Sequence, residues 1–402
     1  MMTPFQRSRP PRVGVLRVAL AAAMLFCLPA AAQIVRVPVE VAQSVTLSPD
    51  QEALVDQFVD SLRGDLFGED KAASSRAVGE LLDPLRDDRV SVAFRQALAS
   101  RLIGDIEAAL NHAQPLLEDG TLNATPYVAL RIAGDLATDR TLAVIVQNLE
   151  HEDPGIRFFA IHCTEAVFFA VRTAAPAVSD RALFADLGQG RAEGLAPRLG
   201  ELLVTEPSPR HAAAIVRSLA EAASVRPDQI GGLSVNAVRQ IAEQTSRRIR
   251  RLADGAPTEE ERLVWLTAAQ AVQRAVAQGS QLGVDAPLGA VRLAGHLAAA
   301  IYRDVEAGRA TPAADRSADG NAEIEKQTLA LAQNLLLFGE QRHAEATGRR
   351  RNQALETAAG GLLDAFVGQG DRNFRQSALA LISTNGLLTD APYGFADDEF
   401  IR

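Results

Sequence analysis

Apolar residues in this chain recur at the three- and four-residue spacing of an amphipathic helix, and this period constrains its fold more than any other feature. The first such segment follows Ser48, a good helix N-cap, with Pro49 suited to the first turn and Gln51 at the capping-box position. Its apolar face comprises Leu54, Val55, Phe58, Val59 and Leu62. Similar segments continue toward the C-terminus. Aromatic residues, which are enriched in β-strands, make up only 5% of the chain. The sequence therefore predicts an all-α protein.

The segment 141–170 contains the clearest repeating unit. Its first helix is predicted to turn one set of apolar residues inward, namely Leu142, Ile145, Val146 and Leu149. A polar turn follows, and Pro154 opens a second helix with Ile156, Ala160 and Ile161 facing inward. Because such a pair cannot bury its apolar faces alone, neighbouring pairs are expected to stack.

The turn of this unit resembles the inter-helix turn of HEAT repeats. The matching residues are Asp153, Pro154, Gly155, Ile156 and Arg157, followed by Ala160. Similar turns at Pro126 and Pro209 lie 28 and 55 residues from Pro154, about one and two helix-pair units. The resemblance is clearest over about residues 80–225. It implies an α-solenoid of HEAT-like antiparallel helix pairs over 48–230, in which Asp153 and Arg157 form a stacking ladder between repeats.

The C-terminal region, 231–402, carries longer amphipathic segments. Five helices are predicted there, at 235–252, 258–278, 287–307, 322–348 and 351–367. The Gly, Pro, Ala and Asp residues of 308–320 predict a mobile loop, and three glycines predict another loop at 186–194. The solenoid is thus expected to grade into a C-terminal helical bundle.

The first 32 residues have the features of a signal peptide. Four arginines and no acid surround the start of an apolar run at 18–28, Pro29 ends the run, and 30–32 supplies three alanines. We expect cleavage after Ala32 rather than an uncleaved anchor, because the run is too short to span a bilayer. The mature protein is therefore expected to be exported, either periplasmic or secreted, in a bacterium and without a transmembrane anchor.

A period of two marks the segment that follows, 33–47. Valines alternate there with other residue types, at Val35, Val37, Val39 and Val41. This spacing predicts an extended N-terminal arm. Pro38 has no amide proton to donate, so the arm is allowed only an edge position in any sheet.

Charge and cysteine content exclude several classes of function. Without the signal peptide the chain keeps 37 basic groups against 50 acids, so its formal net charge changes from −9 to −13. An acidic surface argues against a general nucleic-acid binder. Cys27 leaves with the signal peptide and Cys163 remains alone, which excludes an intramolecular disulfide and a Cys-rich zinc site.

Candidate chemistry is sparse. His162 and Cys163, with His151 nearby, suggest a metal or thiol site, but adjacent helical residues point to different faces and cannot readily bind one ion. Cys163 is therefore expected to be a buried, small apolar residue. The chain has neither a Gly-x-Ser-x-Gly elbow nor a Gly-rich phosphate loop. We assign no catalytic, cofactor-binding or metal-binding residues, and the sequence does not support an enzyme.

Two features near predicted helix ends allow two interpretations each. The arginines at 247–251 and at 349–351 are predicted to be solvated helix termini, with an anion contact in the cell envelope as the alternative. The aromatic and acidic segment 390–402 is predicted to be a C-terminal cap, with a docking peptide as the alternative.

These observations favour an extracytoplasmic scaffold or adaptor that binds a protein partner through the solenoid surface. One alternative is an enzyme or small-ligand-binding protein with a site between the helical array and residues 320–402. Another is a structural cell-envelope protein. Exposed aromatic residues would favour the scaffold, a pocket with convergent polar groups the small ligand, and an even polar surface the structural protein.

Overall fold

The computed structural model of this protein describes residues 35–401 apart from eight internal gaps. The gaps are 69, 88, 112–122, 174–188, 227–228, 279–281, 311–319 and 370–372. The predicted signal peptide, 1–32, lies outside the described residues, as does most of the loop predicted at 308–320.

The described residues form fifteen α-helices and one short 3-10 helix, and they contain no strand. The α-helices are α2 (Val39–Ala42), α3 (Pro49–Leu66), α4 (Lys71–Leu82), α5 (Val92–Asn111), α6 (Thr125–Leu136), α7 (Asp139–Asn148), α8 (Pro154–Thr173), α10 (Gln189–Thr205), α11 (Pro209–Ala223), α12 (Leu233–Arg251), α13 (Glu259–Gln278), α14 (Asp285–Glu306), α15 (Gly320–Thr347), α16 (Gln353–Val367) and α17 (Phe374–Ile382). The 3-10 helix η1 (Asp83–Arg86) follows α4. The all-α prediction is confirmed.

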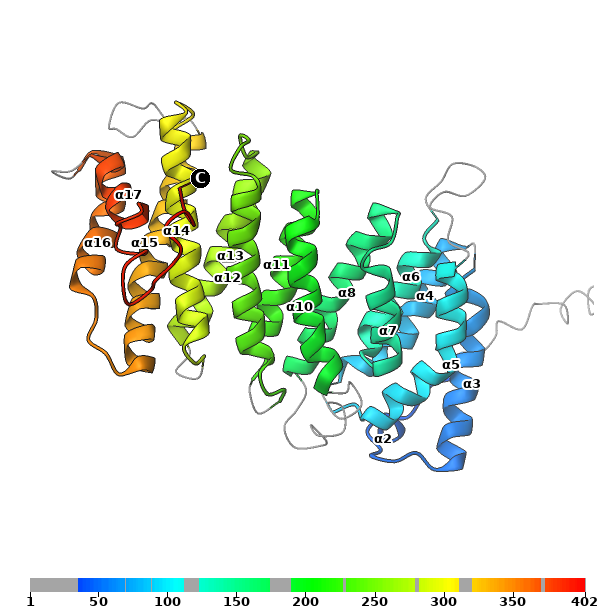
Figure 1. Cartoon of the computed structure of the whole chain (residues 1–402). Coiled ribbons are helices and arrows are strands. Elements are labelled where there is room, and N and C mark those ends of the chain that lie inside the picture. Colours follow the sequence, from blue (N-terminus) through cyan, green and yellow to red (C-terminus); the bar gives the residue numbers. More distant parts are fainter. Residues whose placement is uncertain are drawn as a thin grey trace, which may run out of the picture.

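The helices follow one another along one long axis in the order of the sequence (Figure 1). They alternate between two layers, because each helix packs against its partner in a pair and against a helix of the neighbouring pair. One layer contains the neighbours α3, α5 and α7 and the neighbours α10, α12 and α14. The other contains α4, α6, α8, α11, α13 and α15, each in contact with the next. At the C-terminal end of the array this alternation is reversed. Helix α16 packs on α15 of the second layer, and α17 packs on α14 of the first layer.

Local sequence signals account for where the helices begin. Ser48 Oγ accepts from the amide of Gln51, and the Gln51 side chain accepts from the Ser48 amide at 2.9 Å. This capping box, with Pro49 in the first turn, confirms the predicted start of α3. The predicted apolar face of α3 is buried except for Leu54, which is partly buried. The bounds of α12 to α16 lie within two residues of the predicted ones.

Three local predictions were wrong. The arm predicted at 33–47 contains the helix α2, because the carbonyl oxygen of Pro38 accepts from two following amides and the Ala42 carbonyl accepts from Ser91 at the start of α5. The loop predicted at 186–194 ends earlier, since α10 begins at Gln189. Val146 is 38% exposed, because the other apolar residues of α7 fill its inner face.

The turn of the clearest helix pair is fixed by separate roles for its two charged residues. Asp153 Oδ1 accepts from the amide of Ile156 at 2.9 Å and so caps α8. Arg157 reaches Glu206, beyond α10, with 3.1 Å between Nε and Oε2. Arg157 therefore links neighbouring helix pairs, whereas Asp153 acts within its own pair.

Among the described residues, one helix has the length and hydropathy of a membrane span, namely α8. It packs between α6 and α11 in the second layer, and its inward side chains belong to the core shared by the array. Its outer side carries charged and polar residues, including His162, Glu165 and Arg172. We therefore describe α8 as a core helix of this layer.

Candidate functional site

Of the residues that suggested metal or thiol chemistry, His162 and Cys163 lie on different sides of α8. His151 lies in the turn before α8, where its Nδ1 accepts from the amide of Asp153 at 3.0 Å. Cys163 is buried, and its Sγ donates to the carbonyl oxygen of Leu130 at 3.1 Å. Burial raises the pKa of this thiol well above its usual value. His162 points outward toward Glu165. Cys163 is thus a buried apolar residue, as predicted, and no group of three His, Cys, Asp or Glu in the described part of the chain is placed to hold a metal ion.

Two arginines predicted to be solvated at helix ends instead form ion pairs inside the protein. Arg248 is buried and donates to both carboxylate oxygens of Glu261, at 2.7 and 2.8 Å, and to two carbonyl oxygens near the end of α10. Arg349 is half-buried and donates to Glu340 at 2.6 Å. The prediction was wrong for these residues because each acid lies outside the arginine's own helical turn, 13 and 9 residues away. Both arginines are structural.

The C-terminal segment lies against α14 and α15 (Figure 1). Its aromatic side chains are buried, at Tyr393, Phe395 and Phe400. Glu399 binds two residues of α14, with 3.0 Å to Nε of Arg292 and 3.3 Å to Nε2 of His296. The segment is therefore a cap on the last helices, as predicted, and it supplies an acid partner for His296.

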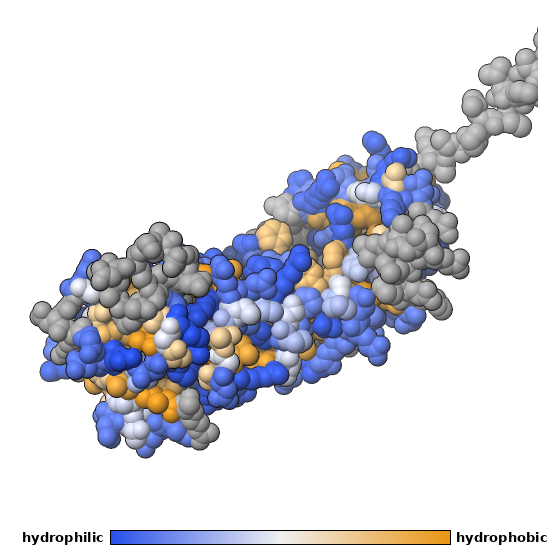
Figure 2. Space-filling model, turned by 90° about the horizontal axis from the view of Figure 1, so that it is seen from above, coloured by the Kyte–Doolittle hydropathy of each residue, from blue (hydrophilic) through white to orange (hydrophobic). Residues whose placement is uncertain are grey.

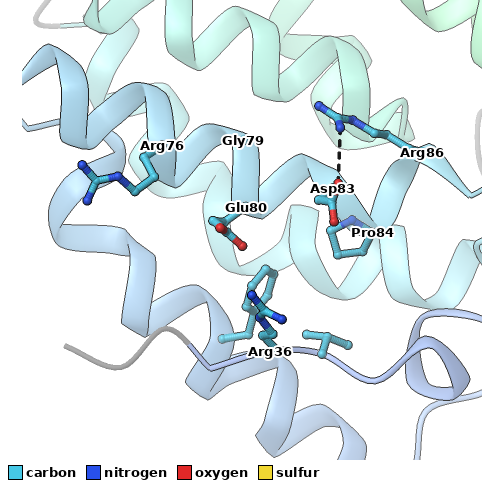
Figure 3. Close-up of a pocket in the computed structure, with 9 residues that line it drawn as sticks. Arg36, Arg76, Gly79, Glu80, Asp83, Pro84 and Arg86 are labelled. Carbon is cyan, nitrogen blue, oxygen red and sulfur yellow. Dashed lines mark hydrogen bonds and ion pairs between the residues drawn. The ribbon is translucent and has the colours of Figure 1, made fainter. Parts of the chain in front are cut away.

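A hollow of about 530 Å³ lies at the N-terminal end of the array, between the segment before α2 and the helices α3, α4 and η1 (Figure 3). Its apolar wall is formed by Val37, Phe58 and Pro84. Phe58 is fully buried in the core, whereas Val37 and Pro84 are partly exposed. This volume is within the range of small-ligand pockets.

Charged residues of both signs surround this hollow. Arg36 and Glu80 approach it from opposite sides, Arg36 from the N-terminal segment and Glu80 from α4 (Figure 3). Within the described residues, neither forms an ion pair. Arg86 pairs with Asp83 at 3.3 Å, so these two side chains satisfy one another. Arg76 points away from the centre (Figure 3).

A second feature is a set of aromatic residues on α6 and α8, of which Phe169 is exposed and the others are partly buried against the core. We call Tyr127, Phe158, Phe159 and Phe169 the aromatic face. Tyr127 of α6 meets Phe159 of α8 edge to face, with ring centroids 5.5 Å apart. Phe169 is 51% exposed, and every other aromatic side chain among the described residues is buried or partly buried. The face therefore spans α6 and α8 and borders α11.

Guanidinium groups cover part of the aromatic face. Arg210 of α11 lies over the ring of Phe158, 5.2 Å from its centroid, and Arg172 lies over Phe169 at 5.1 Å. Arg172 also pairs with Glu221. Arg210 and Arg217 are exposed on the same side of α11, and neither has a carboxylate partner among the described residues. The face therefore has unpaired positive charge on a protein whose overall charge is negative.

Sequence reasoning missed the aromatic face, although a signal for it is present. The outward residues of α8 are Phe158, His162, Glu165, Phe169 and Arg172, spaced by four, three, four and three. This is the period of one helix face. Phe158 and Phe169 are the two aromatic residues on this otherwise polar side of the helix, and that pattern is the signal for the face. Seen from above, with the long axis of the array across the picture, the surface is mainly hydrophilic with apolar patches between the helices (Figure 2).

Comparison with known proteins does not place this chain in a family. No family model matches it. No curated protein matches it either. One solved structure, the crystal structure of an engineered protein, aligns over 85% of this chain and 82% of its own, with 16% sequence identity and a TM-score of 0.27. Those values are too low to relate the two folds.

Proposed function

We propose that this protein is an exported scaffold, an α-solenoid of HEAT-like helix pairs that binds a partner protein on its aromatic face. The two-layer order of consecutive helix pairs supports the solenoid, because each pair packs mainly on its neighbours. The arginine-rich, acid-free start of the chain and its short apolar run support export.

The observation that carries this proposal is the exposure of Phe169, which lies about three helical turns from the partly buried ring of Phe158 on α8. The other apolar side chains of α8 are buried or partly buried against the core, so packing within the described residues does not explain why the ring of Phe169 faces outward. Aromatic residues and arginine are enriched where proteins bind one another, since they combine a large apolar surface with hydrogen-bonding and charged groups. Phe169 with Arg172, and Phe158 with Arg210, give that combination twice on one face.

The partner that fits this face carries an acidic segment. Arg210 and Arg217 have no carboxylate partner among the described residues, whereas Arg172 is already paired with Glu221. A carboxylate of the partner would pair with these arginines of α11, and an apolar side chain beside it would cover Phe169. Attraction between opposite charges also raises the rate of association and makes it depend on salt.

The test is recovery of binding proteins from the envelope fraction by the mature chain, residues 33–402, compared with two variants. Phe169→Ser combined with Arg217→Glu removes the apolar ring and reverses one unpaired charge. Val146→Ser, on the first layer, changes a residue that is also exposed and is the matched control. We expect one acidic partner to be recovered by the wild type and the control but lost from the double variant. Equal recovery by all three chains would exclude the aromatic face.

A further inference from the structure

We propose that the hollow between the N-terminal segment and α4 binds a zwitterionic α-amino acid. The proposal is independent of the protein-binding face, since the hollow lies on α3, α4 and η1 whereas the face lies on α6, α8 and α11. It gives the protein a second, small-molecule site at the N-terminal end of the array.

The charges around the hollow define the chemistry of the ligand. Arg36 and Glu80 approach it from two different elements, and no ion pair joins them to each other or to other described residues (Figure 3). A ligand with a carboxylate and an ammonium group would satisfy both, the carboxylate at the Arg36 guanidinium and the ammonium at Glu80. A simple anion would leave Glu80 unpaired and close to its own charge, and a simple cation would do the same at Arg36.

The remaining residues make a zwitterion a better fit than a larger or more highly charged ligand. Arg86 and Asp83 neutralise one another, and Arg76 points away, so one positive and one negative group remain for the ligand (Figure 3). Phe58, Val37 and Pro84 supply an apolar wall for an aliphatic side chain. The volume of about 530 Å³ accommodates an amino acid with bridging waters.

Three probes of the same shape separate the two charges. L-leucine carries both groups, 4-methylpentanoate lacks the ammonium, and isopentylamine lacks the carboxylate. Isothermal titration calorimetry of the purified protein should give a dissociation constant for leucine at least roughly tenfold lower than for either analogue, a difference of about 1.4 kcal/mol. If leucine does not bind at millimolar concentration, or binds no better than both analogues, the proposal is wrong.

Two substitutions assign the charges to residues. Glu80→Gln should remove the preference for leucine over 4-methylpentanoate, and Arg36→Gln should remove its preference over isopentylamine. Both residues are at least partly exposed, so the variants are expected to fold, and circular dichroism checks this. Arg131→Gln, on the exposed side of α6, is the control and should bind leucine like the wild type. Loss of binding in the control alone, or retention of both preferences in the two site variants, would overturn the assignment.

Discussion

At the scale of single residues, one glycine of α14 is fixed by what packs on it. A Cβ at Gly295 would lie 2.5 Å from a ring carbon of Phe400, in the C-terminal segment, and 2.8 Å from a methyl carbon of Leu388, just before that segment. Gly295→Ala should therefore destabilise the protein by about 1–3 kcal/mol, since overpacking outweighs the gain of about 1 kcal/mol in helix propensity. The midpoint and slope of urea unfolding measure this effect.

Gly360 is the matched control for that substitution. It lies within α16, and a Cβ there would meet nothing within 4 Å. Gly360→Ala should keep only the propensity term and stabilise the protein by about 0.5–1 kcal/mol. The packing explanation fails if the two alanine substitutions shift the unfolding midpoint in the same direction.

The buried pair of Arg248 and Glu261 leads to a second prediction at this scale. Glu261 also accepts from the indole of Trp265 at 3.0 Å, so its carboxylate serves two buried donors. Glu261→Gln leaves the buried guanidinium without its counter-charge and should cost about 3–5 kcal/mol. Glu150→Gln, which breaks an exposed pair with Arg198, should cost less than about 1 kcal/mol. Urea unfolding measures both losses of stability. Similar values for the two variants would contradict the claim that burial makes the Arg248–Glu261 pair more important for stability than the exposed pair.

At the scale of elements, attachment of the C-terminal segment to α14 should weaken in mild acid. Burial lowers the pKa of His296, against the opposing attraction of Glu399, and two nearby arginines, Arg250 and Arg303, lower it further. A third arginine, Arg292, binds the same Glu399 carboxylate as His296. Released His296 would regain its ordinary pKa of about 6.5 and bind a proton that the attached state disfavours. Stability is therefore complete above about pH 6.5 and falls as the pH drops below it.

Hydrogen exchange of residues 383–401, corrected for the intrinsic effect of pH, measures this attachment. Protection in the wild type should fall between about pH 6.5 and 5, in the window set by the ordinary pKa of histidine. Lowering of the Glu399 pKa adds a loss only at more acidic pH, below the ordinary value for a glutamate. His296→Gln should be less protected at pH 7 and should lose the dependence on pH in this window. An unchanged pH profile in that variant would assign the effect to another group.

The helices themselves were largely predictable, because their signals are local. The cap at Ser48 and the apolar period of α3 are contained within one or two turns, and the long helices from α12 to α16 have the same kind of signal. The exceptions depended on distant contacts. Ser91 donates to Ala42 and holds the region of α2, which spacing alone read as extended. Likewise Arg248 was read as solvated because Glu261 belongs to the next helix.

The two candidate sites were less predictable than the helices. The aromatic face requires knowing that Phe169 stays exposed once α6 and α11 have packed against α8. The hollow requires Arg36 to lie across from Glu80, which is 44 residues away in the sequence. Both depend on how helix pairs stack, and the helical period of each segment does not contain that information.

At the scale of the whole molecule, the packing of each helix pair mainly on its neighbours predicts local rather than global unfolding. The main contacts run between successive pairs. A loss of stability in the N-terminal half should therefore have little effect on the C-terminal half. Phe168→Ala, at a fully buried position of α8, should cost about 3–5 kcal/mol. Hydrogen exchange should accelerate in α6, α8 and α11.

The same substitution should leave protection in α14 to α17 unchanged, because these helices have no main contact with α8. Leu362→Ala, buried in α16, is the reciprocal control and should loosen α15 to α17 while leaving α6 and α8 protected. A solenoid behaves in this way, since its stability is the sum of each unit and its interfaces with the next. Equal loss of protection along the whole chain in either variant would instead indicate one cooperative unit and would count against the solenoid.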